Sequence, residues 1–563
     1  MAIIGIDLGT TNSLACVCIK GETVLVPNPL GETLTPSVVS VNEAGEVCVG
    51  AVAKERLVSH PEEAADSFKR YMGTSKTLQL AGRSFTPQEL SSFVLRQLKE
   101  DAERFLGEEV TEAIISVPAY FNDNQRYATR EAGQLAGLVV ERLVNEPSAA
   151  ALAASRISGE EEQSYLVFDF GGGTLDVSVV DFFDNVIEIL AVSGDNKLGG
   201  NDFDLVIGQR FCRQNQINYE EMDPQHRATL LRLAENCKRD LSVKDGAILT
   251  FEMEGESRSM SLSNVELAEA SQDLFGRISL VVTQALKDSG CTIDEIDEVV
   301  LVGGSSKMPV LSFYLEALLG RKPRTIGSPD EVVAMGAGVF AAIKERSQEV
   351  KDLVLTDICP FSLGVEVVNR ADIDKSIMSP VIERNSILPT SKYGHYSNAW
   401  DYQDHITIAI YQGDSYYCRD NLKLGEIEME VTPAKEGQNH LEVCFTYDIN
   451  GILEVEVMDR IKNQRRCETF TSENSRMSPQ EIQQRLAELQ AYKMMPPGGI
   501  RTELVLARGE RLFAELFGDR RRVVADVMEG LQKGIAQKES DQQMKKLCRQ
   551  ANDVFDRLEG IER

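Results

Sequence analysis

The sequence predicts a duplicated, two-lobed α/β domain, then an antiparallel β domain and a helical C-terminal segment. Three observations carry this prediction. Short apolar runs first alternate with amphipathic stretches, apolar residues then recur at every second position, and a capped helical pattern follows residue 478. A chain of 563 residues also exceeds the roughly 250 to 300 residues at which single cores stop growing, so several domains are expected.

The first domain repeats one structural unit. Residues 3–6 and 165–168 are expected to be strands, and residues 124–136 a helix. The two strands end alike, in IDLGTT and FDFGGGT, which indicates an internal duplication. Duplicated lobes imply a cleft between them.

The second domain shows the period of a half-buried strand. Ile406, Ile408 and Ile410 alternate with other residues, and apolar alternation on both sides of Asn450–Gly451 predicts a hairpin. This domain is therefore expected to be antiparallel β.

A helical segment follows. Ser478 can cap its first helix, Pro479 suits the first helical position, and Glu481 completes a capping box. The pattern then stays helical to residue 563, apart from a break at the Pro-Pro-Gly-Gly of 496–499.

The segment VKDLVLT, residues 350–356, joins the first two domains and is too apolar for a passive tether. It is expected either to form a buried edge strand or to dock and undock.

Composition excludes some partners. A net charge of −29 argues against nucleic acid or an anionic membrane surface, because phosphate groups are neutralised by clustered Lys and Arg. The first apolar run contains Asp7 and lacks a basic region before it, so we expect no signal peptide and a cytoplasmic protein. The 11 cysteines are scattered without the spacing of a zinc site.

Three glycine turns after apolar strands point to phosphate chemistry. Asp7 precedes Gly9-Thr10-Thr11, and Asp169 precedes the turn at 171–174, which Asp176 follows. Glycines let the backbone approach phosphates, and carboxylates can hold a hydrated Mg²⁺. The strand at 299–302 runs into a third such turn, and no Walker A pattern occurs, so a P-loop is not expected.

These residues resemble the seventy-kilodalton heat-shock chaperones, the DnaK family, and most of all its shortened bacterial HscC-type members. The phrases IDLGTTNS, SVPAYFND, VNEPSAAALA, FDFGGGTLDVS, LGGNDFD, LVGGSSKMP, SPDE and VKDLVLTD recur in family order over nearly the whole chain. The resemblance implies an actin-like ATPase domain at 1–350, a linker at 351–356, a β-sandwich substrate domain at 357–475 and a helical lid at 476–563.

The resemblance also implies roles for single residues. ATP or ADP, Mg²⁺ and K⁺ are the expected cofactors, with Asp7, Asp169 and Asp176 around the Mg²⁺. None of these carboxylates has to be a strong base, because phosphoryl transfer depends mainly on positioning. The expected catalytic residues are Lys69, Glu146, Asp169, Thr174 and Asp176. The expected nucleotide-binding residues are Asp7, Gly9, Thr10, Thr11, Asn12, Gly171, Gly172, Gly173, Gly199, Gly200, Glu235, Lys238, Arg239, Ser242, Gly303, Gly304, Ser305, Lys307 and Asp330.

Peptide binding and interdomain coupling are implied in the same way. An extended apolar peptide of an unfolded or specific client protein is expected to bind through backbone hydrogen bonds and one side-chain pocket. Its lining is expected to be Val365, Val368, Tyr396, Ala399, Ile406 and Ile408. Coupling is expected to involve Pro118, Arg126, Leu353, Val354 and Leu355.

The chain departs from typical members in ways that bear on its partners. The stretches after Lys69 and after Ser242 are short, which puts dependence on a nucleotide-exchange factor in doubt. Thr356 stands where relatives commonly have leucine, so linker docking is expected to be weaker. A J-domain co-chaperone and a monomeric state are implied.

Other functions share parts of this pattern. Sugar kinases and actin-like filament proteins have the duplicated phosphate turns, but a kinase would need a sugar pocket within its two lobes and a filament protein needs no peptide clamp. The β domain, the apolar linker and the capped helical segment separate these classes from a chaperone. A family member that no longer cycles, acting as a holdase or exchange factor, is the closest rival.

Overall fold

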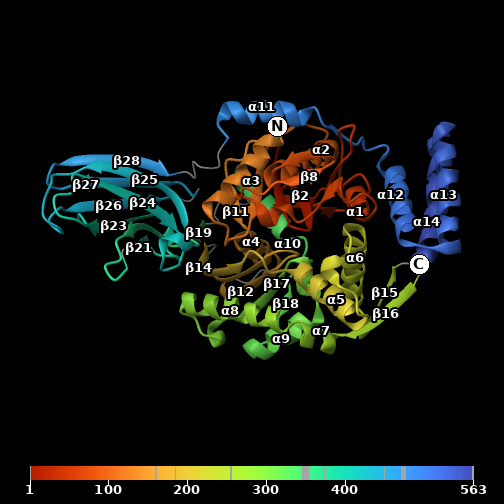
Figure 1. Cartoon of the computed structure of the whole chain (residues 1–563), viewed down its shortest axis with the longest axis horizontal. Helices are drawn as coiled ribbons and strands as arrows, with labels where there is room; N and C mark the ends of the chain where they lie inside the picture. Colours follow the sequence, from red (N-terminus) through yellow and green to blue (C-terminus); the bar gives the residue numbers. More distant parts are fainter. Residues whose placement is uncertain are drawn as a thin grey trace.

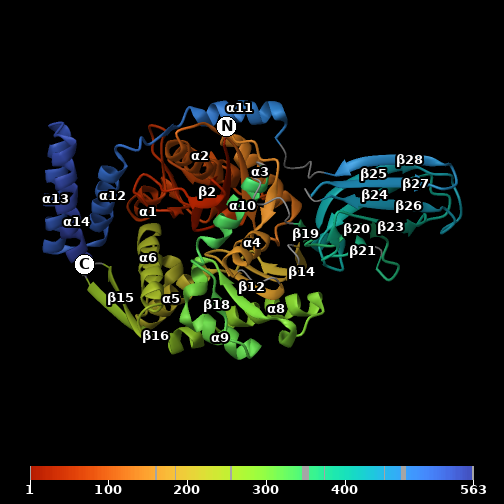
Figure 2. The same cartoon turned by 180° about the vertical axis from the view of Figure 1, so that it is seen from behind.

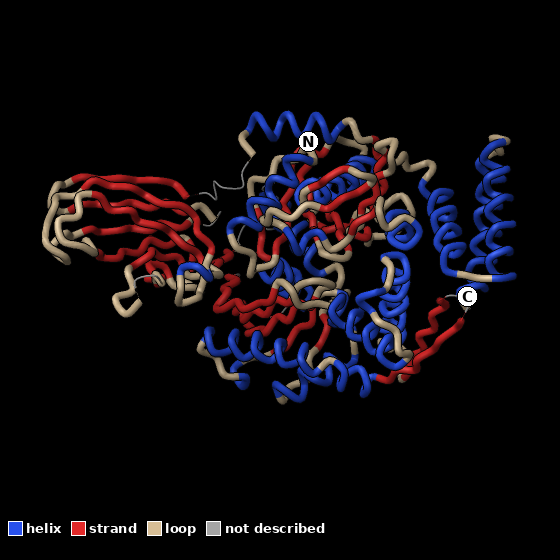
Figure 3. Tube along the Cα trace, viewed as in Figure 1, coloured by secondary structure: helices blue, strands red, loops and turns tan. Residues whose placement is uncertain are grey.

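The computed structural model describes residues 2–158, 162–183, 186–253, 256–344, 354–372, 375–448, 451–470 and 477–560. A mixed α/β region lies in the middle, a β-rich domain projects from one side, and three helices near the C-terminus lie on the opposite side (Figure 1, Figure 2). Figure 3 shows the same division, with strands concentrated in the projecting domain.

The α/β region contains two sheets with matching topology. In the first, the strand order is β11-β10-β1-β2-β3, with β4 beside β2, and in the second it is β18-β17-β12-β13-β14, continued by β19 and β22. In each sheet the leading strand, β1 or β12, pairs in parallel with one neighbour and antiparallel with the other. The duplication inferred from the sequence therefore appears as two equivalent sheets, which we call lobe I (the β1 sheet and its helices) and lobe II (the β12 sheet and its helices).

The elements of lobe I are β1 (Ala2–Leu8), β2 (Asn12–Ile19), β3 (Glu22–Leu25), β4 (Thr35–Pro36), β5 (Val39–Val41), β6 (Glu46–Val49), α1 (Ala51–Ser59), β7 (Ala64–Ala65), β8 (Leu78–Leu80), β9 (Arg83–Phe85), α2 (Pro87–Leu106), β10 (Val110–Val117), α3 (Asp123–Leu135), β11 (Leu143–Asn145) and α4 (Glu146–Ser158). Those of lobe II are β12 (Glu162–Phe170), β13 (Leu175–Phe183), β14 (Val186–Asp195), α5 (Gly200–Gln214), α6 (Pro224–Asp240), β15 (Gly246–Met253), β16 (Glu256–Ser263), α7 (Asn264–Ala270), α8 (Gln272–Ser289), β17 (Glu298–Val302), α9 (Pro309–Leu319), β18 (Arg324–Thr325) and α10 (Val332–Lys344).

Helices α4 and α10 join the lobes. Their small residues share one apolar cluster with both sheets, including Ile114 of lobe I and Tyr165 of lobe II. A Cβ atom on Gly336 of α10 would lie 1.9 Å from the carbonyl oxygen of Ala149 in α4. Glycine at this crossing therefore sets how closely the two helices approach.

The β domain consists of two four-stranded antiparallel sheets, β21-β20-β24-β25 and β23-β26-β27-β28, around one apolar core. Alternate residues of its strands are buried, as the period of two predicts, and Ile408 and Val443 are examples. The strands of these two sheets are β20 (Leu363–Val367), β21 (Ile377–Ile382), β23 (Thr390–Tyr396), β24 (His405–Gln412), β25 (Leu422–Glu430), β26 (Leu441–Tyr447), β27 (Leu453–Asp459) and β28 (Gln464–Phe470). The short strands β19 (Val354–Ile358) and β22 (Ile387–Leu388) belong to the sheet of lobe II.

The C-terminal segment, which we call the lid, lies on the α/β region. It comprises α11 (Pro479–Gln490), β29 (Lys493–Met494), α12 (Ile500–Glu515), α13 (Gly518–Ala536) and α14 (Asp541–Glu559). The capping box of Ser478 and Glu481 is present. The sequence predicted one break in this helical segment, but the chain also turns at Phe517 and at 537–540. In addition, β29 pairs with β6 and so extends the small β6-β5-β7 sheet of lobe I. None of the described helices has both the length and the apolarity that a bilayer span needs.

The β domain is anchored to lobe I through a buried carboxylate. The Tyr447 hydroxyl donates to Asp123 in α3 at 2.9 Å, and the Gln412 side chain both accepts from the Asp123 amide and donates to its carboxylate. In addition to these hydrogen bonds, an ion pair joins Arg384 of the β domain to Asp288 of lobe II at 2.8 Å. The β domain thus contacts both lobes.

We expect Gly336→Ala to lower the free energy of unfolding by about 1–3 kcal/mol, because the new methyl group forces α4 and α10 apart. The matched control is Gly276→Ala in α8, where an added Cβ meets no atom within 4 Å and the change should be neutral or slightly stabilising. Urea titration monitored by circular dichroism compares the two. Equal midpoints would show that the crossing tolerates a wider spacing.

Candidate functional site

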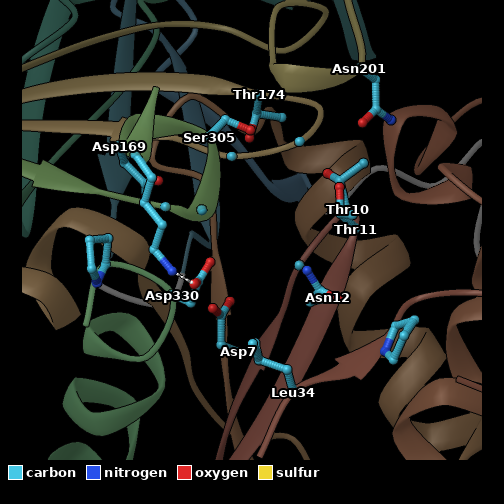
Figure 4. Close-up of a pocket in the computed structure, with 18 of the residues that line it drawn as sticks. Asp7, Thr10, Thr11, Asn12, Leu34, Asp169, Thr174, Asn201, Ser305 and Asp330 are labelled. Atoms are coloured by element: carbon cyan, nitrogen blue, oxygen red, sulfur yellow. Dashed lines mark hydrogen bonds and ion pairs between the residues drawn. The ribbon is translucent and has the colours of Figure 1, made fainter. Parts of the chain in front are cut away.

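A cavity of about 620 Å³ lies between the two lobes, where the duplicated strands end. The β1–β2 turn, with Thr10 and Thr11, lies on one side, and the β12–β13 turn, with Thr174, faces it (Figure 4). Residues of α6 and of the turn after β17 also line the cavity. The predicted residues that line it are Asp7, Gly9, Thr10, Thr11, Asn12, Lys69, Glu146, Asp169, Gly171, Gly172, Thr174, Glu235, Lys238, Arg239, Ser242, Gly303, Gly304, Ser305, Lys307 and Asp330.

The two glycine turns, Gly9-Thr10-Thr11 and residues 171–174, face each other closely. A Cβ atom on Gly172 would lie 1.7 Å from the Thr11 hydroxyl oxygen, so only glycine fits at this point of the second turn. The buried Thr11 hydroxyl has no hydrogen-bond partner among the described residues. A buried polar atom beside a glycine cradle suits a phosphate oxygen as the missing partner.

Three aspartates converge behind these turns. Asp169 and Asp176 are direct cross-strand partners on β12 and β13, and Asp7 accepts a 2.9 Å hydrogen bond from Ser116 on β10. Burial, reinforced by the charge of Glu146, raises the pKa of Asp7 and of Asp176 to about 7, and burial raises that of Asp169 well above its usual range. The cluster is therefore a low-dielectric site that favours a positive charge.

A cation at this position fits best as a hydrated ion. Among the described residues, no group of three His, Cys, Asp or Glu side chains is arranged to hold a metal directly. Mg²⁺ commonly keeps several waters and uses one or two carboxylates together with substrate phosphates. Asp7 and Asp169, which line the cavity, suit that mode of binding.

Lys69 and Glu146 form a buried ion pair beside the aspartates. The Lys69 Nζ atom donates to Glu146 Oε1 at 2.9 Å, and both side chains are less than one-tenth exposed. The Lys69 Nζ atom also lies 5.5 Å from the ring centre of Phe121. Burial and the ion pair fix the ammonium group at the end of the cavity that contains the glycine turns and the aspartates.

The opposite end of the cavity is lined by α6. Residues 235, 238 and 242 were expected on one helix face; Glu235, Lys238 and Arg239 belong to this helix, whereas Ser242 lies just beyond its end, and all four line the cavity. Lys238 is held by a 2.8 Å ion pair with Asp204. Burial raises the pKa of Asp204 to about 6, despite the Lys238 charge, which acts in the other direction.

The turn after β17 completes this end. Gly303 has a φ of 81°, and a Cβ on Gly304 would lie 2.3 Å from an Asp330 carboxylate oxygen. Lys307 forms an ion pair with Asp330. A side chain at either glycine would therefore collide with neighbouring residues, and both glycines line the cavity with their backbone.

Four predicted residues lie behind the cavity. Gly173, Gly199 and Gly200 pack against the phosphate turns and Ser305, and Asp176 is buried, accepting a 3.1 Å hydrogen bond from the Tyr120 amide. The cavity is also lined by residues that were not predicted from the sequence: Leu14, Glu32, Leu34, Pro36, Lys54, Asn201, Met308, Pro329 and Val333. Asn201 and Pro329 lie within quoted motifs and could have been found, but Lys54 reaches the site only through the packing of α1.

A hydrogen-bonded path leads from the cavity to the linker. Arg126 donates to the backbone oxygens of Ala119 and Phe121 and to the Asn145 side chain. Asn145 directly precedes Glu146 and donates to both carboxylate oxygens of Asp357 in β19, at 2.7 and 2.6 Å. Pro118 directly follows β10 at the start of this path.

The linker itself is a strand of lobe II. Val354, Leu355 and Thr356 pair in parallel with β14, and the Thr356 hydroxyl donates to the Ile187 oxygen at 3.3 Å. Residue Leu353 and residues 351–352 lie outside the described part of the chain. Polar Thr356 therefore makes a docking contact of its own.

The predicted peptide-binding residues divide into two groups. Val365, Ile406 and Ile408 are buried in the core of the β domain. Tyr396 is half-buried and its hydroxyl lies 3.2 Å from that of Ser379; Val368 is exposed and Ala399 is half-buried.

The arrangement as a whole has a counterpart among known families. The chain matches the family model described as Hsp70 protein over residues 3–81 and 74–559. These matches cover nearly all of the described elements, from β1 to α14. The chain therefore belongs to the Hsp70 family.

Proposed function

We propose that this chain is an ATP-driven, peptide-binding chaperone in which nucleotide state controls the β domain through β19. Membership of the Hsp70 family supports a chaperone role, ATP hydrolysis and binding of ATP or ADP with Mg²⁺ in general terms. The observation that carries the proposal for this chain is the path from Glu146 in the cavity, through Asn145, to Asp357 in β19, the strand that contains the linker residues Val354, Leu355 and Thr356.

The cavity residues suit transfer of the γ-phosphoryl group of ATP to water. The Thr10 and Thr11 hydroxyls and the Gly171–Gly172 backbone would hold phosphate oxygens, and Lys69 would place positive charge beside the group in flight. Bound Mg²⁺ would supply further neutralisation of phosphate charge. Glu146 and Thr174 would orient the attacking water, and the products would be ADP and inorganic phosphate.

The structure has the features expected of a state in which the linker is docked. With β19 paired to β14, the β domain bonded to Asp123 and the lid lying on lobe I, the lid does not cover the β domain. We propose that hydrolysis releases β19 and lets the lid close over an extended apolar peptide. Linkage then requires peptide and ATP to influence each other's equilibrium binding reciprocally.

Finer features of the proposal follow the sequence resemblance. A J-domain co-chaperone, K⁺ as a second cation, a monomeric cytoplasmic protein and an HscC-like specialisation are all proposed on that basis. Three of the six predicted groove residues belong to the β domain core and Tyr396 packs against that core, so we propose that a single apolar side chain of the client binds beside Tyr396. The proposed client is therefore an extended peptide segment that is anchored by one apolar side chain.

Replacing Lys69 or Thr174 tests the ATPase assignment. Lys69→Ala and Thr174→Ala should each slow single-turnover ATP hydrolysis by about 100-fold or more, since each removes a group fixed at the phosphate end of the site. ATP binding, measured by equilibrium dialysis, should persist. Lys76→Ala, an exposed lysine near Lys69, is the matched control. If both Lys69→Ala and Thr174→Ala hydrolysed ATP at the rate of the parental chain, the ATPase assignment would be refuted.

Breaking the path to the linker tests coupling. Asp357→Ala removes both hydrogen bonds from Asn145, so an apolar peptide should stimulate hydrolysis about fivefold less than in the parent. Basal hydrolysis should change little, because the cavity keeps its residues. The control, Asp372→Ala, removes an exposed carboxylate paired only locally with Lys375.

If peptide stimulated ATP hydrolysis by Asp357→Ala as strongly as in the parent, the coupling between the cavity and the β domain would not depend on the Asn145–Asp357 contact. Hydrolysis that ignores peptide even in the parental chain would instead favour a holdase that no longer cycles.

A further inference from the structure

Helix α12, the second helix of the lid, lies beside the mouth of the nucleotide cavity. Two helices flank that mouth, α1 from lobe I and α6 from lobe II, and their side chains meet there, with Lys54 2.9 Å from Glu235. Figure 1 and Figure 2 both show α12 alongside α1 and close to α6. This helix is thus placed where it can contact both lobes at once.

Its contact with lobe I is apolar and ionic. Ile500 and Ala507 of α12 share a buried cluster with Val52 and Ala53 of α1. Arg56 of α1 also pairs with Glu503 of α12 at 2.5 Å. This contact covers most of the length of α1.

Its contact with lobe II is a bidentate ion pair. Arg232 donates from Nε and a terminal nitrogen to the two carboxylate oxygens of Glu515, at 2.9 and 2.8 Å. The Glu515 side chain is only 8% exposed, so the pair is largely shielded from solvent. Arg232 lies on α6 about one turn before Glu235, which lines the cavity. A second pair, Arg520 with Glu252 at 3.0 Å, joins the start of α13 to the β15–β16 hairpin.

One buried arginine ties the two contacts together. The Arg511 side chain is 3% exposed and pairs with Glu55 of α1, with Glu515 and, at 2.5 Å, with Glu559 of α14. A buried charge that loses partners is costly, so the four groups hold one geometry. Since Glu515 also binds Arg232, this network runs without a gap from lobe I through the lid to lobe II.

The Pro496–Gly499 break makes this placement possible. The Gly499 amide donates to Pro496 and the Ile500 amide to Pro497, which turns the chain between β29 and α12. β29 can therefore pair with β6 while α12 starts in a new direction along α1. A continuous helix from α11 could not satisfy both contacts.

We propose that α12 is a clasp: while the lid is docked, it holds α1 and α6 together and so keeps bound nucleotide in the cleft. Nucleotide leaves when α12 releases at least one lobe. The inference rests on the proposed nucleotide site, and it adds that the lid itself, without a second protein, governs the rate of release. It also makes lid docking and cleft closure mutually stabilising.

Release of a fluorescent, non-hydrolysable ATP analogue from the full-length chain tests the clasp. Excess unlabelled ATP is mixed with the loaded protein in a stopped-flow instrument, and the dissociation rate is recorded. Arg232→Ala should raise that rate by about fivefold or more, because it removes the shielded anchor of α12 on lobe II and leaves that lobe to the more exposed Arg520–Glu252 pair, while Glu515 keeps Arg511 as a partner. Arg232→Lys should give a smaller increase, since a lysine retains the charge but not the bidentate geometry.

Matched variants separate the clasp from general destabilisation. Arg210→Ala removes a lobe II arginine that pairs with Glu266 inside the same lobe, and it should leave release unchanged. Glu55→Gln weakens the lobe I anchor and should also speed release. Glu55→Gln combined with Arg232→Ala should accelerate release by less than the two single effects combined, because both changes act through the same bridging helix.

Three results would overturn the proposal. Release at the parental rate in folded Arg232→Ala, or equal acceleration in Arg210→Ala, would show that α12 does not restrain the cleft. Additive acceleration in the double variant would show two independent contacts and no clasp. If the parental chain fails to retain the analogue at all, the proposed nucleotide site itself is wrong, which the binding step of the experiment reveals separately.

Discussion

The arrangement of the domains depends on one interaction, the parallel pairing of β19 with β14. This pairing makes the linker a strand of lobe II, and β22 then continues the same sheet into the β domain. Because β19 carries Asp357, its position also places a carboxylate against Asn145, next to Glu146. Backbone hydrogen bonds are lost together when a strand leaves a sheet, so the docked and released forms are expected to be discrete states.

Much of this architecture could be predicted from local sequence patterns. The two glycine turns, the alternating strands and the Ser478 cap each depend on neighbouring residues, and each appears where it was expected. The placement of most cavity residues also follows, because the ends of equivalent strands meet between duplicated sheets. The nucleotide and peptide roles of those residues stay predictions.

Other features have no local signature. Arg232, Glu55 and Glu515 read as ordinary charged residues on helix surfaces, and only the packing of α12 between two lobes brings them together. The pairing of β29 with β6 joins segments that are separated by most of the chain. Val365, Ile406 and Ile408 show the opposite case, since alternation marks them as inward-facing but cannot distinguish a groove from a core.

The pairing of β29 with β6 has a consequence for lobe I if the lid undocks. Its backbone exchanges hydrogen bonds with β6 through Lys493 and Met495, whose amides donate to Gly45 and Val47. Once β29 leaves, these carbonyl groups face water along an open sheet edge. An open edge can pair with an extended segment of another chain, so we expect the docked lid to keep this edge of lobe I from self-association.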